Sequence, residues 1–221
     1  MNIDMSNVLK PIRLAVLISG GGRSLLNLQR RIDEGLLDAQ IEVVVSSRAN
    51  APGVERARGA GMRVVVADRA RLSPFQFQEA ITKAVQGVDL VVMAGFLSMW
   101  QVPPEFAGRV INIHPALLPD FGGHGMYGAK VHEAVLRSGR VESGCTVHFC
   151  DNQYDHGPII VQRKVPVFAA DTPEILAVRV FERDLRDVRE RALVDRMDRR
   201  VDLVDVARRR DPLADPEELL V

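Results

Sequence analysis

The chain has 221 residues with 29 basic and 29 acidic side chains, so its formal net charge is zero and gives no net field for nucleic acid. A hydrophobic share of 47% supplies a sizeable core, and two cysteines are too few for a secreted disulfide scaffold. The N-terminus lacks a signal-peptide core, and no apolar run reaches the length of a membrane span. We expect a cytoplasmic protein with an N-terminal tail (1–10), one domain (11–186) and a charged C-terminal helix or tail (187–221).

Apolar runs alternate with helical patterns along the first half of the chain. Strands are predicted at residues 12–19, 41–47, 63–67, 90–94 and 110–113. Helices are predicted between them at 24–34, at 52–59 opened by Asn50, and at 74–85 with Ser73 as its N-cap. Continuous Val, Ile and Leu runs are typical of a parallel sheet covered on both faces. The pattern predicts an α/β fold with a single doubly wound, mostly parallel open sheet of Rossmann-like type.

The pattern changes after His114. A loop rich in Pro and Gly (115–125) precedes a predicted helix at 129–137. Predicted strands at 145–149 and 158–165 form a hairpin-like pair, and a last helix starts near residues 171–173 with an acidic or hydroxyl cap. Residues 179–210 are crowded with Arg, Asp and Glu. We interpret them as a solvated amphipathic helix in preference to a nucleic-acid contact.

A glycine-rich turn joins the first predicted strand to the first helix. Its residues are Gly20, Gly21, Gly22, Arg23 and Ser24. Glycines allow a ligand to approach the backbone, and amides at a helix start attract anions. The turn lacks the Lys-Ser/Thr of a nucleotide P-loop and the third glycine of a dinucleotide fingerprint. We favour an anion site over a tight turn without a ligand, because open sheets bind ligands at this edge.

An amide and an imidazole end an otherwise apolar strand. Alternation places Asn112 and His114 on one face of that strand, with Ile111 and Ile113 on the other. The pair is either a hydrogen-bonded core pair or part of an active site at the carboxyl end of the strand. Asp155, on the loop between the last two strands, is either a turn residue that caps its own backbone or the carboxylate of that site.

Together the three side chains suit acyl transfer. The amide stabilises negative charge on a carbonyl oxygen, the imidazolium donates a proton, and the carboxylate keeps the imidazole charged. No Ser or Cys sits in a recognisable nucleophile elbow, which favours direct attack by a substrate amine. Thr146 and His148 share a strand face that points towards these residues, and we expect them to support the site. For His148 the alternative is a hydrogen-bonded histidine of the core. No metal is expected, because His132-Glu133 lacks the second His of a zinc helix.

Five segments resemble the folate-dependent formyltransferases, in the order found in that family. They are residues 18–22 (ISGGG), 91–97 (VVMAGFL), 112–119 (NIHPALLP), 144–149 (GCTVHF) and 155–160 (DHGPII). The resemblance spans about residues 12–179. It implies a formyltransferase fold and transfer of a formyl group from 10-formyltetrahydrofolate.

The resemblance also implies roles for individual residues. Asn112 would bind the formyl oxygen, His114 would act as general acid, and Asp155 would raise the pKa of His114 and help to shuttle protons. The ribonucleotide would contact the glycine turn (Gly20, Gly21, Gly22, Arg23 and Ser24), Pro115 and Asp184. The folate would contact Leu97, Ser98, Met99, Trp100, Asn112, Cys150, Asp151 and Tyr154.

The most similar members of the family are those that act on glycinamide ribonucleotide in purine synthesis. Relatives that formylate tRNA carry an extra C-terminal domain and deformylases an extra N-terminal one, so elimination also favours this acceptor. The chain departs from the family at Asp184, where a Glu is usual, at Pro74, where some relatives have Arg, and beyond Arg186.

We therefore predict a monomeric or homodimeric enzyme that acts on small molecules, without nucleic-acid or membrane partners. Two alternatives stay open. The first is a deformylase-like hydrolase, in which water replaces the amine. The second is a non-catalytic relative that binds folate and phosphate, because the C-terminal region departs from the family pattern.

Overall fold

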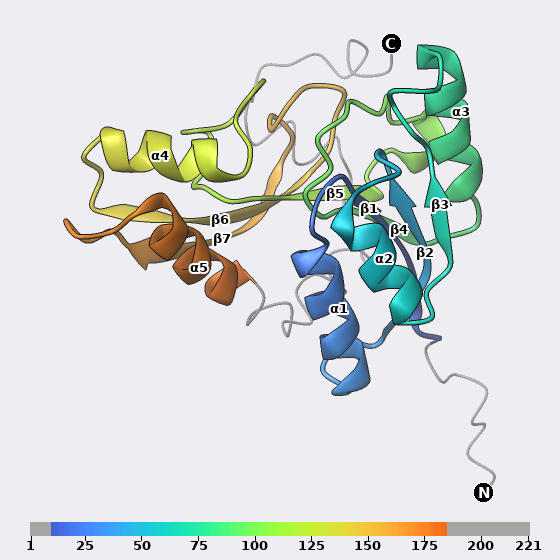
Figure 1. The fold of residues 1–221 in the computed structure, drawn as a ribbon, viewed down its shortest axis with the longest axis horizontal. Coiled ribbons are helices and arrows are strands. Elements are labelled where there is room, and N and C mark those ends of the chain that lie inside the picture. The colour runs from blue at the N-terminus through green and yellow to red at the C-terminus, as the bar shows by residue number, and fades with distance from the viewer. Residues whose placement is uncertain (1–9, 185–221) are drawn as a thin grey trace, which may run out of the picture. The chain divides into compact units, whose positions relative to one another are not determined.

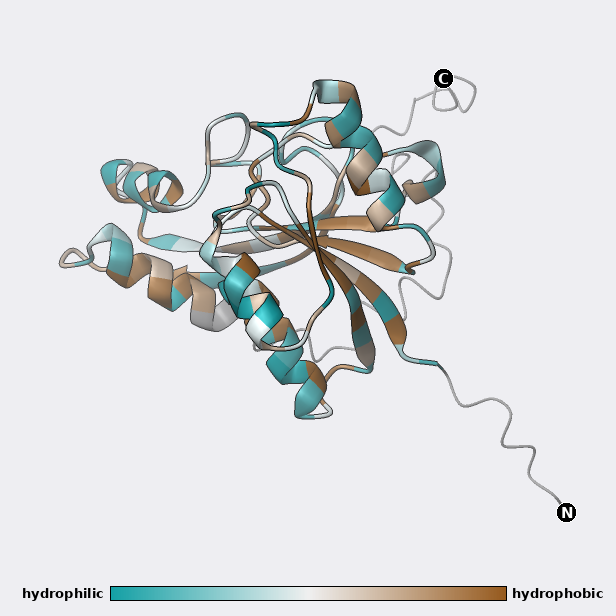
Figure 2. Cartoon of the chain, turned by 45° about the vertical axis from the view of Figure 1, so that its right-hand side comes forward, coloured by the Kyte–Doolittle hydropathy of each residue, from teal (hydrophilic) through white to brown (hydrophobic). Residues whose placement is uncertain are grey.

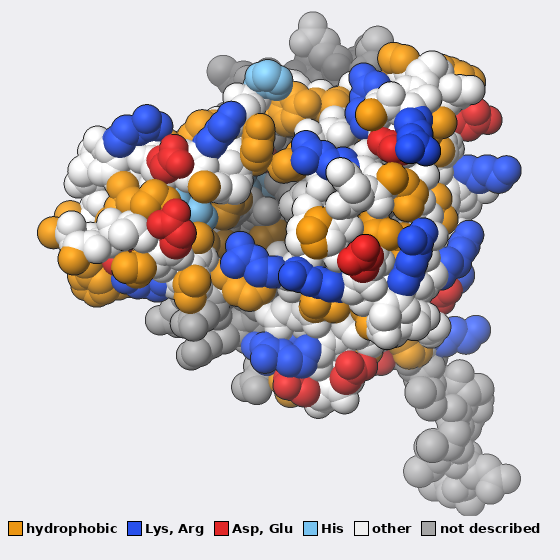
Figure 3. Space-filling model, viewed as in Figure 1, with side chains coloured by type: hydrophobic (Ala, Val, Ile, Leu, Met, Phe, Trp, Pro, Cys, Tyr) orange, Lys and Arg blue, Asp and Glu red, His pale blue; other side chains and the backbone are white. Residues whose placement is uncertain are grey.

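A computed structural model describes residues 10–184 (Figure 1). The chain divides into two compact units, Met1–Trp100 and Gln101–Val221. Residues 1–9 of the predicted tail and the predicted charged segment 187–221 lie outside the described residues. On the face drawn in Figure 3, basic and acidic side chains are spread among apolar ones, in keeping with the zero net charge of the sequence.

The first unit alternates parallel strands with helices. Its strands are β1 (Ile12–Ile18), β2 (Ala39–Ser46), β3 (Val64–Val66) and β4 (Leu90–Met93). Its helices are α1 (Arg23–Asp33), α2 (Pro52–Gly59) and α3 (Pro74–Ala84). The strands lie in the order β3-β2-β1-β4, and each neighbouring pair is parallel. The elements predicted for this part of the chain are confirmed, with ends shifted by two residues at most.

Burial explains why the strand runs of the first unit are continuously apolar. Val16, Leu17 and Ile18 of β1 are fully buried, as expected for a parallel strand covered on both faces. Figure 2 shows the strands as largely hydrophobic, whereas the helices mix hydrophobic and hydrophilic positions.

The helix caps follow the sequence only in part. Ser73 caps α3 as predicted, in a reciprocal capping box with Gln76. The prediction that Asn50 opens α2 is wrong, because the N-cap is Ala51 and no side chain caps this helix. Pro52 stands at the first helical position, where its missing amide hydrogen would have had no partner within the helix.

The second unit contains an antiparallel set of strands. They are β5 (Val110–His114), β6 (Glu142–Phe149) and β7 (Ile159–Pro166), in the order β5-β6-β7. A short 3-10 helix, η2 (Pro104–Phe106), precedes them, α4 (Ala129–Arg137) lies between β5 and β6, and α5 (Pro173–Asp184) follows β7. The predicted hairpin-like strand pair is confirmed, although β6 begins three residues before the predicted position 145.

A core between α4, α5 and the strand pair holds the second unit together. Val135, Cys145, Val165, Leu176 and Val180 form this buried cluster. Thr172 supplies the predicted hydroxyl cap of α5, because its Oγ1 accepts a hydrogen bond from the backbone of Ile175. The packing fixes β6, the strand that carries His148.

Candidate active site

The pairing of β5 with β6 brings the polar residues of the two strands together. In the antiparallel ladder Asn112 lies opposite His148, and His114 lies opposite Thr146. Directly opposite residues project from the same face of a sheet. The Asn112 Nδ2 atom accordingly lies 3.1 Å from His148 Nε2. His148 of β6 thus lies beside the expected pair on β5, Asn112 and His114.

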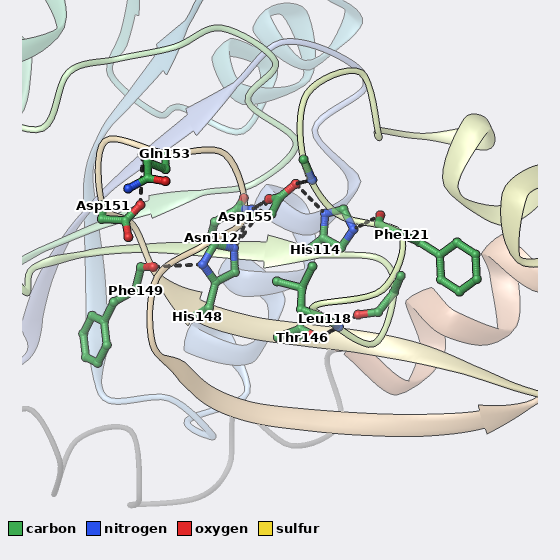
Figure 4. A network of polar contacts seen from close by, with 12 residues as sticks. Asn112, His114, Leu118, Phe121, Thr146, His148, Phe149, Asp151, Gln153 and Asp155 are labelled. Carbon is green, nitrogen blue, oxygen red and sulfur yellow. Dashed lines mark hydrogen bonds and ion pairs between the residues drawn. The ribbon is translucent and has the colours of Figure 1, made fainter. Parts of the chain in front are cut away.

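Asp155 joins this group from the loop after β6 (Figure 4). Its Oδ1 accepts a hydrogen bond from Asn112 Nδ2 at 3.2 Å and lies 3.6 Å from His148 Nε2. Its Oδ2 lies 3.4 Å from His114 Nδ1. The structure therefore brings together Asn112, His114, His148 and Asp155, and the carboxylate lies between the two imidazoles.

The loop after β5 holds both members of the His114–Asp155 pair. His114 Nε2 lies 2.8 Å from the Phe121 carbonyl oxygen, which can only accept, so Nε2 donates. The Gly123 amide donates to Asp155 Oδ2 at 3.0 Å. Sequence reasoning missed Phe121, because a backbone carbonyl gives no residue-type signal. Phe121 and Asp155 both have positive φ, 57° and 53°, which non-glycine residues seldom adopt.

Burial and charge oppose each other at this pair. Burial lowers the pKa of His114, and it outweighs the opposite effects of the Asp155 charge and the Phe121 carbonyl. Asp155 raises the pKa of His114, as expected from the sequence, but the net pKa of His114 still lies below its ordinary value. Burial raises the pKa of Asp155, but the two histidines and the Gly123 amide lower it by more. The site thus favours an ionised carboxylate.

Thr146 holds the backbone of the loop that follows β5. It lies opposite His114, but its hydroxyl donates to the Ala116 carbonyl at 2.6 Å and accepts from the Leu118 amide at 3.1 Å. These bonds hold the loop that starts at Pro115. Thr146 therefore contacts the site through the loop backbone, in keeping with a supporting residue.

The glycine turn in the first unit leads directly into α1, as expected for an anion site. Gly22 caps the helix with a left-handed φ of 70°. The turn rests on α2: the Gly53 amide donates to the Gly20 carbonyl at 3.0 Å, and Arg56 donates to the Gly21 carbonyl at 2.6 Å. Sequence reasoning missed these two supports, which come from a segment about thirty residues further along the chain.

Residues 97–100, which are expected to contact the folate, are anchored within the first unit. The Leu97 amide donates to Ser19 Oγ at 2.9 Å, and the Met99 carbonyl accepts from Gln78 at 3.1 Å. Trp100 is buried, with its indole nitrogen 3.2 Å from Thr82 Oγ1. These bonds fix the backbone of residues 97–100.

Cys150, Asp151 and Tyr154, three further residues expected to contact the folate, lie on the same loop as Asp155. The Cys150 amide donates to the Val110 carbonyl at 2.8 Å, which ties the loop to β5. The Asp151 carboxylate lies 2.7 Å from His156 Nδ1, and the Tyr154 ring makes an edge contact with His124. The side chains of Asp151 and Tyr154 are therefore engaged by neighbours other than Asn112 and His114.

Asp184 is the last residue of α5, and its side chain lies outside the described atoms. Within residues 10–184, no group of three or more His, Cys, Asp or Glu side chains is arranged to hold a metal ion. None of the helices described there combines the length and the apolar character needed to cross a membrane.

Comparison with protein families matches residues 12–193 to the formyl transferase family, which is most of the chain. The chain belongs to this family. Its relatives include the chloroplastic phosphoribosylglycinamide formyltransferase of Arabidopsis thaliana, 41% identical over 78% of this chain. The chain spans only 61% of the length of that relative. The phosphoribosylglycinamide formyltransferase of Haemophilus influenzae is 35% identical over 78% of this chain and 81% of its own.

Among solved structures, glycinamide ribonucleotide transformylase 1 of Symbiobacterium toebii superimposes with a TM-score of 0.74. It is 37% identical, and the match covers 86% of this chain and 88% of that one. The predicted α/β fold with a mostly parallel sheet and a C-terminal strand pair is confirmed for this formyl transferase. The residue roles and the domain limits 11–186 stay predictions.

We expect Gly53→Ala to destabilise the glycine turn. A Cβ atom at Gly53 would lie 2.7 Å from the Gly20 carbonyl oxygen and 2.8 Å from Ile18 Cδ1. Overpacking of this kind typically costs about 1–3 kcal/mol, measurable by urea unfolding. Gly59→Ala on the same helix is the matched control, because its Cβ would meet no atom within 4 Å. Equal stability of the two variants would contradict the close packing.

The lowered pKa of His114 predicts a loss of stability in mild acid. Because the folded protein binds this proton more weakly than the unfolded chain does, the free energy of unfolding falls as pH drops below 6.5, the ordinary value for His. His114→Gln removes this contribution, so its stability should fall less between about pH 7.5 and about pH 5.5. Urea unfolding at both pH values measures the difference.

The control for this prediction is His124→Gln, which removes an exposed histidine. It should retain the pH dependence of the unmodified protein. If His114→Gln retains it as well, burial does not lower the pKa of His114.

Proposed function

We propose that this formyl transferase moves the formyl group of 10-formyltetrahydrofolate onto the amine of glycinamide ribonucleotide. The observation that carries this proposal is the network of Asn112, His114 and Asp155, which joins an amide donor, an imidazole and a carboxylate within hydrogen-bonding or ion-pair distance. The names of the relatives support the same acceptor. The chemistry needs no metal or covalent nucleophile.

In the proposed reaction the substrate amine attacks the formyl carbon, and the carbonyl oxygen becomes an oxyanion. Asn112 donates a hydrogen bond to that oxygen, an interaction that strengthens as its charge develops. The attacking nitrogen loses a proton to Asp155. The bond from the formyl carbon to N10 of the folate then breaks, and N10 receives a proton from His114. Asp155 lies 3.4 Å from His114 Nδ1 and returns its proton there.

The lowered pKa of His114 suits a residue that gives up a proton readily. The folded site holds this proton less firmly than water does, since burial disfavours the imidazolium. The ionised Asp155 beside it acts in the opposite direction and stabilises the imidazolium, which offsets part of the lowering by burial.

The glycine turn supports a phosphorylated acceptor. Backbone amides at the start of α1 attract an anion, and Gly22, which adopts the αL conformation, has no Cβ to block a ligand at that point. Phosphate binding at a helix start needs no dedicated side chain. We propose that this turn holds the phosphate of the ribonucleotide, with Arg23, Ser24, Pro115 and Asp184 as further contacts.

We also propose that the folate binds along Leu97–Trp100 and the loop at 150–154. The backbone of both segments is tied by hydrogen bonds to neighbouring strands or helices, so each presents a fixed edge. Such pre-ordered backbone groups bind a flat heterocycle at little entropic cost. The enzyme is proposed to be cytoplasmic and to act on small molecules.

We expect Asn112→Ala to lower kcat by about a hundredfold to a thousandfold, the usual effect of removing one oxyanion donor. Asp155→Asn should also remove measurable turnover, because it removes the proton acceptor. Exposed Asn50 lies outside the proposed contacts, so Asn50→Ala is the matched control and should keep normal turnover. A near-normal kcat for Asn112→Ala would contradict its role.

The acceptor is tested by following tetrahydrofolate release with and without glycinamide ribonucleotide. We expect a signal that requires the ribonucleotide and is lost in Asp155→Asn. Release of formate without an acceptor would identify the alternative, a hydrolase in which water replaces the amine. Folate binding without any product would identify a non-catalytic relative.

A further inference from the structure

His148 is a buried imidazole in contact with the proposed catalytic amide, and the reaction described above gives it no task. It is 2% exposed and lies on β6 directly opposite Asn112. Its two ring nitrogens face different partners. The Phe149 carbonyl oxygen lies 2.8 Å from Nδ1, whereas Asn112 Nδ2 lies 3.1 Å from Nε2.

These partners determine the tautomer of His148. A carbonyl oxygen can only accept, so Nδ1 must carry a hydrogen. The neutral ring then has its lone pair on Nε2, where it accepts a hydrogen bond from the Asn112 amide. The other N–H of the same amide points to Asp155 Oδ1 at 3.2 Å.

This arrangement also settles which way the Asn112 amide faces. A flipped amide would place its oxygen against the Asp155 carboxylate and against the Nε2 lone pair, and both contacts would be repulsive. Both N–H groups therefore point towards His148 and Asp155. A formyl oxygen that accepts from Asn112 must replace one of these two partners.

We propose that His148 is a positioning residue that holds one N–H of Asn112 while the other turns from Asp155 to the formyl oxygen. Asp155 tolerates the exchange, because its Oδ2 keeps the Gly123 amide at 3.0 Å and faces His114. His148 offers only the Nε2 lone pair, and burial leaves no water to replace the amide. The inference rests on the proposed function and adds a residue to it.

The hold depends on the tautomer of His148 that carries its hydrogen on Nδ1. A ring with a hydrogen on Nε2 has no lone pair there for Asn112, and its Nε2–H would turn to Asp155 Oδ1, now 3.6 Å away. The neighbour of His148 across the ladder on β7 is Ile159, whose apolar side chain offers no hydrogen bond.

The test compares His148→Gln with His148→Leu. Glutamine places an amide oxygen near the position of Nε2 and accepts from Asn112 at every pH, whereas leucine offers no acceptor. We expect His148→Leu to lose about tenfold to a hundredfold in kcat, with both KM values within about threefold of the unmodified enzyme. His148→Gln should regain most of kcat.

His132→Gln is the matched control, because His132 is a similarly buried histidine on α4 outside the proposed site. It should keep its kcat. Equal kcat losses in His148→Gln and His148→Leu would overturn the proposal. A fall in kcat for His148→Leu that only mirrors lost stability in urea would do the same.

A direct measurement separates this proposal from the proposed function. In protein labelled with 15N-histidine, the resonance lost in His148→Gln identifies His148. We expect a protonated Nδ1 and an unprotonated Nε2 near neutral pH. The opposite tautomer overturns the proposal even in an active enzyme. An inactive unmodified protein with the expected tautomer overturns the proposed function and, with it, the role of His148 in turnover.

Discussion

The Asp155 carboxylate is the group on which the candidate site depends. Its two oxygens face four side-chain or backbone groups that come from β5, from the loop after β5 and from β6. Each contact is modest alone, but in a buried network every partner that is lost leaves another polar group unsatisfied. The left-handed φ of Asp155 is part of this arrangement, because a strained backbone persists only where the surrounding contacts over-determine it.

Two backbone carbonyls complete the arrangement by setting the tautomers of the histidines. The Phe121 carbonyl takes the Nε2–H of His114, and the Phe149 carbonyl takes the Nδ1–H of His148. Each ring therefore turns its other nitrogen towards the same carboxylate. Protonation of one imidazole disfavours protonation of the other, an effect seen in the lowering of the His114 pKa by His148. One carboxylate thus faces two imidazoles that lie far apart along the chain.

In the first unit, hydrogen bonds to backbone carbonyls likewise fix the glycine turn. The Gly20 and Gly21 carbonyls accept hydrogen bonds from Gly53 and Arg56 of α2, which fix the turn that leads into α1. A phosphate that binds there would find donors already in place, and little entropy would be lost on binding. The proposed phosphate site and the proposed catalytic group therefore both depend on backbone groups oriented by tight packing.

The sequence by itself determined the order of strands and helices, because buried apolar runs, Ser73 and the glycine turn act locally. It also singled out Asn112, His114 and Asp155, since polar residues at the end of a buried strand are costly without a purpose. It did not determine that Phe121 and Gly123 hold the pair, that Gly53 braces the turn, or that burial outweighs Asp155 in the pKa of His114. Only the tertiary structure decided these points. Backbone carbonyls and amides are the same in every residue, and burial depends on neighbours that are distant along the chain.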